Sequence, residues 1–222
     1  MPLDGLQIVL AGGGGGLGSA TAELLRHEGA NVIVGSRSHG VHADITNAEE
    51  RSRLLDAAPE MYGLVVFTGI PARGGEPEML RESFQVNCEG PVLLAREAAA
   101  RMTKRGMQGA IVMLSTMQAV ALFPGSTAYA SAKAALQHSA RILAKECRGS
   151  ANIRVNVIAP GVTAAGMAEA SIASGKYDRY INDNVIARFG RALDVARAVR
   201  FLLEPDNYIT GQVLSVDGGI TL

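Results

Sequence analysis

Short apolar runs alternate along the whole chain with longer segments of helical periodicity. The apolar runs are continuous, which is typical of parallel strands covered on both faces. We expect strands at residues 7–11, 31–34, 63–67, 110–114, 154–158 and 212–216. Helical patterns cover residues 19–28, 47–57, 78–104, 126–146 and 194–203. This alternation predicts an α/β fold of the Rossmann type, a doubly wound parallel sheet with helices on both faces.

The connection after the second predicted strand is unusually short. Only three residues separate Arg37, at the end of that strand, from the short run that begins at Val41. A parallel crossover normally needs a dozen or more residues. We therefore expect the helix between strands 2 and 3 to be reduced or missing, and the third strand to be rudimentary.

Composition narrows the class of protein. A chain of 222 residues without repeats or linkers predicts a single domain over residues 1–222. The 21 basic and 21 acidic residues are interleaved, a balance that predicts no nucleic-acid partner and no anionic membrane partner.

The cysteines and the hydropathy of the chain indicate in which cellular compartment the protein is expected. Cys88 and Cys147 form no disulfide framework, and together with the four histidines they show no metal-ligand spacing. No basic leader precedes the first strand, and no apolar run reaches the ~18 residues of a membrane span. These features predict a soluble cytoplasmic protein with reduced thiols and no metal.

A glycine-rich loop joins the first strand to the first helix. Glycine allows a tight turn and a close approach to a pyrophosphate, and the helix N-terminus offers free N–H groups to that anion. A flexible loop is the alternative, but the position between strand and helix favours a dinucleotide site. The candidate contacts are Gly12, Gly16, Leu17 and Gly18.

The end of the second strand bears on the choice of cofactor. A carboxylate there would bind the ribose 2′-hydroxyl of NAD. This chain instead has Arg37 between Ser36 and Ser38, a set that suits the 2′-phosphate of NADP. A solvated turn is the alternative, and we predict NADP(H) over NAD(H).

Tyr129 and Lys133 lie four residues apart on a predicted helix, so their side chains share a face. A free tyrosine has a pKa near ~10. A neighbouring ammonium group favours the phenolate, so we expect Lys133 to lower the pKa of Tyr129 toward the working range of an acid/base catalyst.

These motifs, in this order, resemble the short-chain dehydrogenase/reductase family over essentially the whole chain. The spacing of the glycines resembles the family's cofactor loop, and residues 86–90, 154–161 and 210–219 resemble three further family segments. The resemblance implies that Asn87 supports a proton-relay water and that Lys133 also binds the nicotinamide ribose. It further implies cofactor contacts from Asp44 and Ile45 beside the adenine, from Gly69, from Tyr129, and from Pro160, Gly161, Val162 and Thr163 beside the nicotinamide.

The chain departs from the family pattern at three motifs. Ala11 replaces the threonine that usually precedes the glycine loop. The substrate-orienting serine falls on Thr116, with Ser115 as the fallback. Residues 66–69 replace the Asn-Asn-Ala-Gly motif, of which only Gly69 is retained.

The resemblance implies an NADP(H)-dependent oxidoreductase that transfers a hydride between the nicotinamide and a small carbonyl or alcohol substrate. Residues 162–190 would form a short substrate lid, and the helices at 78–104 and 126–146 would build a homodimer or homotetramer. Two alternatives remain open: an NAD-dependent alcohol dehydrogenase of the same family, or an inactive cofactor-binding regulatory or scaffold protein. The sequence leaves open whether Ile70, Met117, Gln118 and Phe123 line the pocket or belong to the core.

Overall fold

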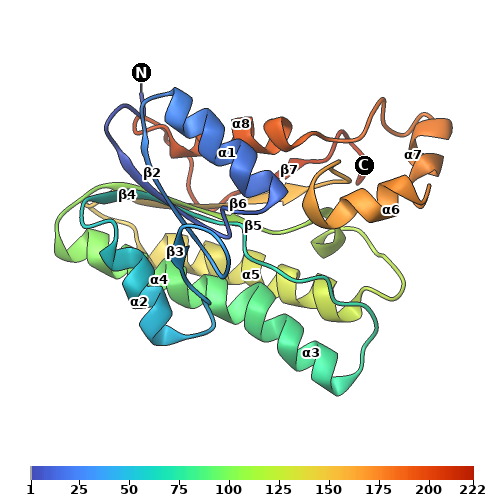
Figure 1. The fold of residues 1–222 in the computed structure, drawn as a ribbon, viewed down its shortest axis with the longest axis horizontal. Helices are drawn as coiled ribbons and strands as arrows, with labels where there is room; N and C mark the ends of the chain where they lie inside the picture. The colour runs from blue at the N-terminus through green and yellow to red at the C-terminus, as the bar shows by residue number, and fades with distance from the viewer. Residues whose placement is uncertain (1) are drawn as a thin grey trace.

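The computed structural model describes residues 2–222 and arranges seven strands in one parallel sheet (Figure 1). The order across the sheet is β3-β2-β1-β4-β5-β6-β7. The strands are β1 (Gln7–Ala11), β2 (Asn31–Ser36), β3 (Val41–His42), β4 (Met61–Val66), β5 (Gly109–Leu114), β6 (Ile153–Pro160) and β7 (Val213–Val216). The order reverses between β1 and β4, and ligands of such sheets bind beyond the carboxyl ends of the strands at this point.

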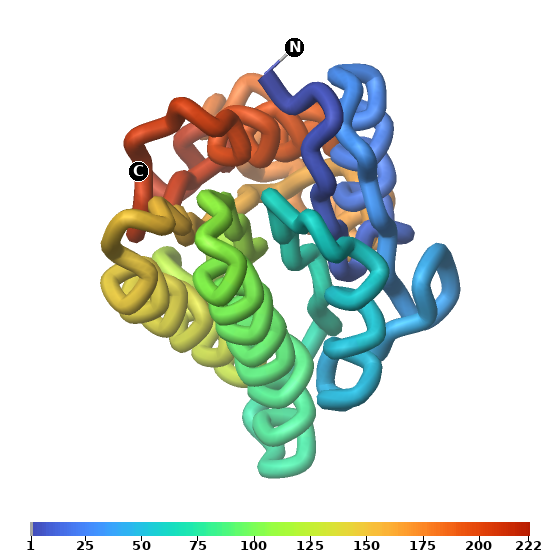
Figure 2. The backbone as a smooth tube through the Cα atoms, turned by 90° about the vertical axis from the view of Figure 1, so that its left-hand side faces the viewer, coloured from blue at the N-terminus to red at the C-terminus, as the bar shows by residue number. Residues whose placement is uncertain are grey.

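Helices cover both faces of the sheet, as the apolar pattern predicts. α1 and α8 lie on one face, and α2, α3, α4 and α5 lie on the other (Figure 1). The helices are α1 (Gly16–His27), α2 (Ala48–Asp56), α3 (Pro77–Phe84), α4 (Gly90–Lys104), α5 (Thr127–Glu146), α6 (Glu169–Ala173), α7 (Asp178–Asn182) and α8 (Ala192–Leu203). Figure 2 shows α4 and α5, green and yellow, side by side.

Two apolar layers hold the helices to the sheet. Ile8 and Leu10 on β1 belong to the layer with Leu25 of α1, whereas Val9 belongs to the layer with Leu136 of α5. Successive strand residues point to opposite faces, so β1 anchors both helix layers at once. The doubly wound α/β architecture is confirmed.

As expected, no helix lies between β2 and β3, and β3 is rudimentary. Residues 37–40 alone connect β2 to β3, and β3 pairs through only two residues, Val41 with Gly35 and His42 with Ser36. Gly40 has a φ of +70°, and a Cβ there would overlap the Val34 carbonyl oxygen. This edge is therefore a compact loop that depends on glycine.

Several predicted boundaries were wrong. The helix predicted from residue 19 begins at Gly16, because Gly16 and Gly18, which have low helix propensity, obscure its first turn. The helix predicted over 78–104 is present as one continuous helical run, but a π-helical segment, Gln85–Glu89, divides it into α3 and α4. β4 begins two residues earlier than expected and ends at Val66.

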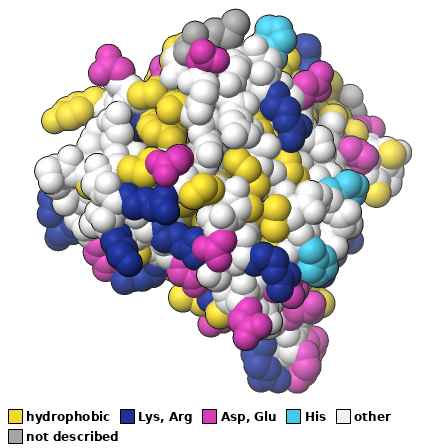
Figure 3. Space-filling view, turned by 60° about the vertical axis from the view of Figure 1, so that its left-hand side comes forward, with side chains coloured by type: hydrophobic (Ala, Val, Ile, Leu, Met, Phe, Trp, Pro, Cys, Tyr) yellow, Lys and Arg dark blue, Asp and Glu magenta, His cyan; other side chains and the backbone are white. Residues whose placement is uncertain are grey.

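Charged side chains of both signs are mixed on the face in Figure 3, where Lys and Arg alternate with Asp and Glu. Within residues 2–222, none of the helices combines the length and hydropathy that crossing a membrane would require.

Candidate active site

A cavity of about 850 Å³ lies at the carboxyl ends of the strands. It gathers all of the predicted site residues except Asn87. These lining residues are Gly12, Gly16, Leu17, Gly18, Ser36, Arg37, Ser38, Asp44, Ile45, Gly69, Thr116, Tyr129, Lys133, Pro160, Gly161, Val162 and Thr163. The cavity also includes Ile70, Met117, Gln118 and Phe123, which the sequence left open between pocket and core.

The glycine loop forms one wall through its backbone. Gly12 has a φ of +78°, and a Cβ on it would lie 2.9 Å from Thr68 N. α1 follows, and its N-cap, Gly15, makes no side-chain capping hydrogen bond. The first-turn N–H groups of α1 thus border the cavity without a side-chain cap, an arrangement that fits the pyrophosphate of a dinucleotide.

The loop after β2 forms the wall beside the glycine loop. Ser36 Oγ accepts hydrogen bonds from the backbone N–H groups of Ser38 (3.2 Å) and His39 (2.7 Å). Arg37, at the tip of this turn, has an exposed side chain. His39 also lines the cavity, a position that no motif in the sequence indicates.

Asp44 and Ile45 close the same end of the cavity. The Asp44 carboxylate accepts hydrogen bonds from Thr46 N (2.9 Å) and Thr46 Oγ1 (2.7 Å). These bonds hold the pKa of Asp44 below its usual value, with a smaller contribution from Arg37. The Asp44 carboxylate is therefore held in place by Thr46, two residues along the chain.

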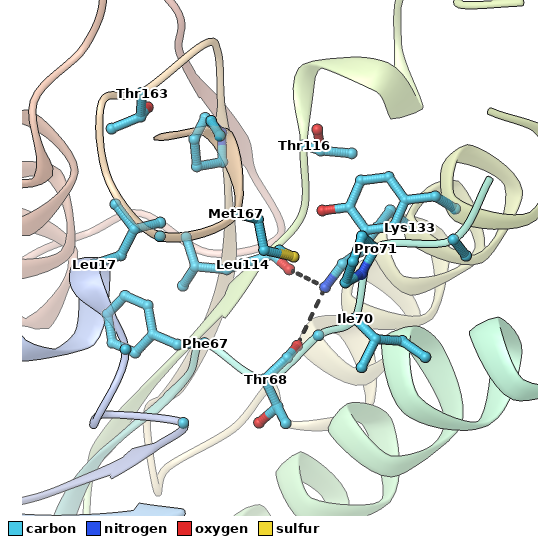
Figure 4. Close-up of a pocket in the computed structure, with 18 of the residues that line it drawn as sticks. Leu17, Phe67, Thr68, Ile70, Pro71, Leu114, Thr116, Lys133, Thr163 and Met167 are labelled. Carbon is cyan, nitrogen blue, oxygen red and sulfur yellow. Dashed lines mark hydrogen bonds between the residues drawn. The ribbon is translucent and has the colours of Figure 1, made fainter. Parts of the chain in front are cut away.

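Lys133 is the buried cation of the site, with only 2% of its surface exposed. Its Nζ donates to the carbonyl oxygens of Leu114 (2.8 Å) and Thr68 (3.4 Å) (Figure 4). No carboxylate among residues 2–222 forms a salt bridge with it, and burial lowers the pKa of Lys133 to about 8. A proton on Lys133 is thus exchangeable near physiological pH.

Tyr129 borders the cavity as an un-ionised phenol. Burial raises the pKa of Tyr129 to about 12, and the nearby Thr116 side chain offsets part of this rise. The expectation that Lys133 brings this pKa toward neutrality was wrong for the protein alone, because desolvation dominates and Lys133 Nζ is held by two carbonyl oxygens.

The two hydroxyl residues after β5 have different surroundings. Ser115 Oγ donates to Lys133 O (3.2 Å) and accepts from Gln137 Nε2 (2.9 Å), so it is committed to α5. Thr116 Oγ1 accepts one hydrogen bond, from Gln118 N at 3.3 Å, and Thr116 lines the cavity with Tyr129, whose pKa it lowers. The geometry favours Thr116 over Ser115 as the residue that contacts a substrate.

Asn87 lies behind the cavity wall, in the π-helical segment between α3 and α4. Its Nδ2 donates to Ile70 O (3.0 Å) and Ser83 Oγ (3.0 Å), and its Oδ1 accepts from Ile70 N (2.9 Å). A Cβ on Gly69 would lie 2.8 Å from Asn87 Oδ1 and 3.4 Å from Lys133 Nζ. Asn87 therefore braces the loop that passes beside Lys133, and Gly69 is the residue that allows this approach.

The segment predicted as a lid, residues 162–190, contains α6 and α7 and reaches across to the glycine loop. A Cβ on Gly16 would lie 3.0 Å from Gly166 N and 3.3 Å from Ala165 Cβ. Farther along, Tyr177 stacks on Tyr180 with ring centroids 6.4 Å apart. One face of this segment thus lines the cavity, through Ala165, Gly166 and Tyr177.

Neither a disulfide nor a cluster of metal-binding side chains is found among the residues that the structure describes. Both cysteines are free, and residues 2–222 contain no group of three or more His, Cys, Asp or Glu side chains that could hold a metal ion.

Comparison with known proteins places this geometry in a family. The family model described as Enoyl-(Acyl carrier protein) reductase matches residues 34–221. The chain belongs to the short-chain dehydrogenase/reductase family. Members of this family named among its relatives are dehydrogenases and reductases, and the chain is an oxidoreductase of hydroxyl or carbonyl groups.

Relatives in the short-chain dehydrogenase/reductase family match over nearly their full length. The 7alpha-hydroxysteroid dehydrogenase of Escherichia coli (strain K12) is 30% identical over 243 residues, covering 98% of this chain and 94% of the relative. Carbonyl reductase family member 4 of Danio rerio is 32% identical over 242 residues, covering 96% of this chain and 97% of the relative. A solved structure described as ElxO with NADP bound has a TM-score of 0.87 at 25% identity, covering 97% of this chain and 98% of its own. A structure described as a short chain dehydrogenase/reductase family protein has a TM-score of 0.89 at 29% identity and covers both chains completely.

Proposed function

We propose that this chain is an NADP(H)-dependent oxidoreductase that transfers a hydride between the nicotinamide and a small carbonyl or alcohol substrate. One observation carries the proposal: a single continuous cavity brings Tyr129 and Thr116 together with the glycine loop and Arg37. Tyr129 and Thr116 are suited to donating a proton to a substrate oxygen. The glycine loop and Arg37 are suited to binding phosphate groups.

Each part of the cavity wall has a role in holding the cofactor. The N–H groups at Gly16, Leu17 and Gly18 bind the pyrophosphate. Arg37, flanked by Ser36 and Ser38, binds the 2′-phosphate. All of the following residues line the cavity. Asp44 and Ile45 would contact the adenine, and Gly69, Tyr129 and Lys133 would contact the nicotinamide ribose. Pro160, Gly161, Val162 and Thr163 would contact the nicotinamide.

The bound cofactor supplies the hydride, and the chain's own residues control the proton. Thr116 and Tyr129 hold the carbonyl oxygen, and Tyr129 donates its proton as negative charge develops there. The raised pKa of Tyr129 keeps the phenol protonated at neutral pH, the form that can donate a proton to the carbonyl oxygen. Lys133 reloads the proton, and Asn87 holds the Ile70 backbone along the relay. Positioned proton transfer of this kind contributes ~10²–10⁴-fold to a rate.

Titration of the purified protein with NADPH and with NADH, followed by nicotinamide fluorescence, tests the cofactor assignment. We expect tight NADPH binding and much weaker NADH binding. A panel of carbonyl compounds then tests the chemistry, with Tyr129→Phe as the control that keeps the cofactor site and loses about 10²–10⁴-fold in turnover. A Tyr129→Phe enzyme of normal turnover would contradict the mechanism. Failure of the wild type to bind either nucleotide would contradict the cofactor assignment, whereas NADPH binding without turnover of any carbonyl compound would favour the inactive cofactor-binding alternative.

We also propose a cytoplasmic homodimer or homotetramer, built as one domain. Its support is the exposure of apolar side chains on two neighbouring helices: Leu93 on α4 is 36% exposed and Ile142 on α5 is 47% exposed. An ion pair between Arg96 and Glu146 (2.7 Å) ties the two helices into one surface.

A further inference from the structure

His39 occupies a position that the proposed mechanism does not use. It lies on the four-residue loop between β2 and β3, opposite the glycine loop. A Cβ added to Gly14 would lie 2.9 Å from His39 Nδ1 and 3.0 Å from His39 Cγ. The imidazole therefore rests directly on the glycine loop, and Gly14 is the residue that leaves room for it.

The loop holds this imidazole in a defined orientation. The backbone of His39 is fixed to Ser36 Oγ by two hydrogen bonds, one from its N–H (2.7 Å) and one to its carbonyl oxygen (2.9 Å). Its Nδ1 lies 2.9 Å from Ser38 Oγ. When the Ser38 hydroxyl donates to Nδ1, the ring proton lies on Nε2. Nε2 has no hydrogen-bond partner within residues 2–222 and is a donor free to bind a ligand.

The charges around His39 favour an anion. Arg37 lies two residues away on the same loop, and no acid among residues 2–222 forms a salt bridge with either side chain. Asp44 is engaged by Thr46. Glu50 Oε2 accepts from Asp44 N (2.6 Å) and lies 3.7 Å from His42 Nε2. The cavity wall made by Arg37 and His39 thus has donors without a bound acceptor.

We propose that His39 is a second ligand of the 2′-phosphate, acting with Arg37, and that this pair sets the preference for NADP(H) over NAD(H). The inference rests on the proposed function, because it assumes that the cavity binds a nicotinamide dinucleotide. It adds a specificity-determining residue that lies against the glycine loop at Gly14 and lines the same cavity as Arg37. The two residues would hold the phosphate between the two loops.

The test compares four nucleotides on three variants of the full chain. Dissociation constants of NADPH, NADH, adenosine 2′,5′-bisphosphate and AMP are measured for His39→Ala, His39→Asn and His138→Ala. His138 is an exposed histidine on α5 that does not line the cavity, so its variant is the matched control. Loss of one charge-assisted hydrogen bond should raise the Kd of NADPH and of the bisphosphate about tenfold in His39→Ala. The Kd of NADH and of AMP should not change.

His39→Asn should retain part of the affinity for NADPH, because its amide can still donate a hydrogen bond. Equal weakening of NADPH and NADH would show that the ring only supports the loop, and would overturn the inference. So would unchanged or tighter NADPH binding in His39→Ala. A wild type that binds neither nucleotide would instead overturn the proposed function, and the two failures are therefore distinguishable.

Discussion

At the scale of single residues, the adjacent hydroxyls of Ser115 and Thr116 have separate tasks. The Ser115 hydroxyl is buried between α5 and β5, and Thr116 lines the cavity together with Tyr129. Thr116→Val should therefore lower kcat/KM by at least tenfold, and it should lower the thermal midpoint only slightly, because it removes one hydrogen bond, from Gln118 N at 3.3 Å. Ser115→Ala should retain most turnover but cost about 1 kcal/mol of stability, because the half-buried Gln137 amide loses its acceptor. Steady-state kinetics and thermal denaturation on both variants check this, and a reversed pattern would exchange the two roles.

The pKa of Lys133 predicts how reduction depends on pH. Burial lowers that pKa to about 8, so the ammonium form that reloads Tyr129 is present below pH 8 and is lost as the pH rises through it. Tyr129 itself keeps its proton over this range, since its pKa is about 12. We expect kcat/KM for carbonyl reduction to be constant from pH 6 to 7.5 and to fall above pH 8. A profile that stays flat to pH 10, measured at saturating NADPH, would contradict the role of Lys133.

At the scale of secondary-structure elements, the loop after β4 depends on the absence of one side chain. A methyl group on Gly69 would meet Asn87 Oδ1 at 2.8 Å and would approach Lys133 Nζ. Gly69→Ala should therefore destabilise the protein by about 1–3 kcal/mol, as overpacking does, and should also lower turnover. Gly75→Ala is the matched control on the same loop, where a Cβ meets nothing within 4 Å. Chemical denaturation of both variants measures the difference, and equal stabilities would contradict the close approach.

The sequence predicted most helices and strands of this fold, but not the π-helical segment that carries Asn87 or the contact of His39. Strand and helix types were predictable because buried parallel strands are continuously apolar and helices keep a regular period. The π-helical segment at Asn87 was not, because one extra residue in a helix leaves the pattern of apolar positions nearly intact. The motif residues were brought together in one cavity, since the ends of parallel strands meet at one edge of the sheet. His39 was missed because its contact with Gly14 joins two loops far apart in the sequence, and no periodicity records such a contact.

At the scale of the whole molecule, the surface formed by α4 and α5 is the candidate interface between copies. Leu93→Glu combined with Ile142→Glu places charges on two exposed apolar positions. Burying such charges is costly, so the double variant should shift the protein toward monomer in light scattering at micromolar concentration. Val185→Glu, at an exposed position between α7 and α8, is the control and should leave the mass unchanged. A wild type that is monomeric at these concentrations would contradict the proposed assembly.

The contact of Gly166 and Ala165 with Gly16 has a kinetic consequence. The segment of residues 162–190, which lines the substrate end of the cavity, contacts the glycine loop proposed to bind the pyrophosphate. Binding of the nucleotide should therefore affect binding of the substrate, and the reverse. Linkage requires that nucleotide and substrate then change each other's affinity by the same factor. We expect compulsory order, with the nucleotide entering first and leaving last. Product-inhibition patterns measure this order: oxidised nucleotide should compete with NADPH, and the alcohol product should not compete with the carbonyl substrate.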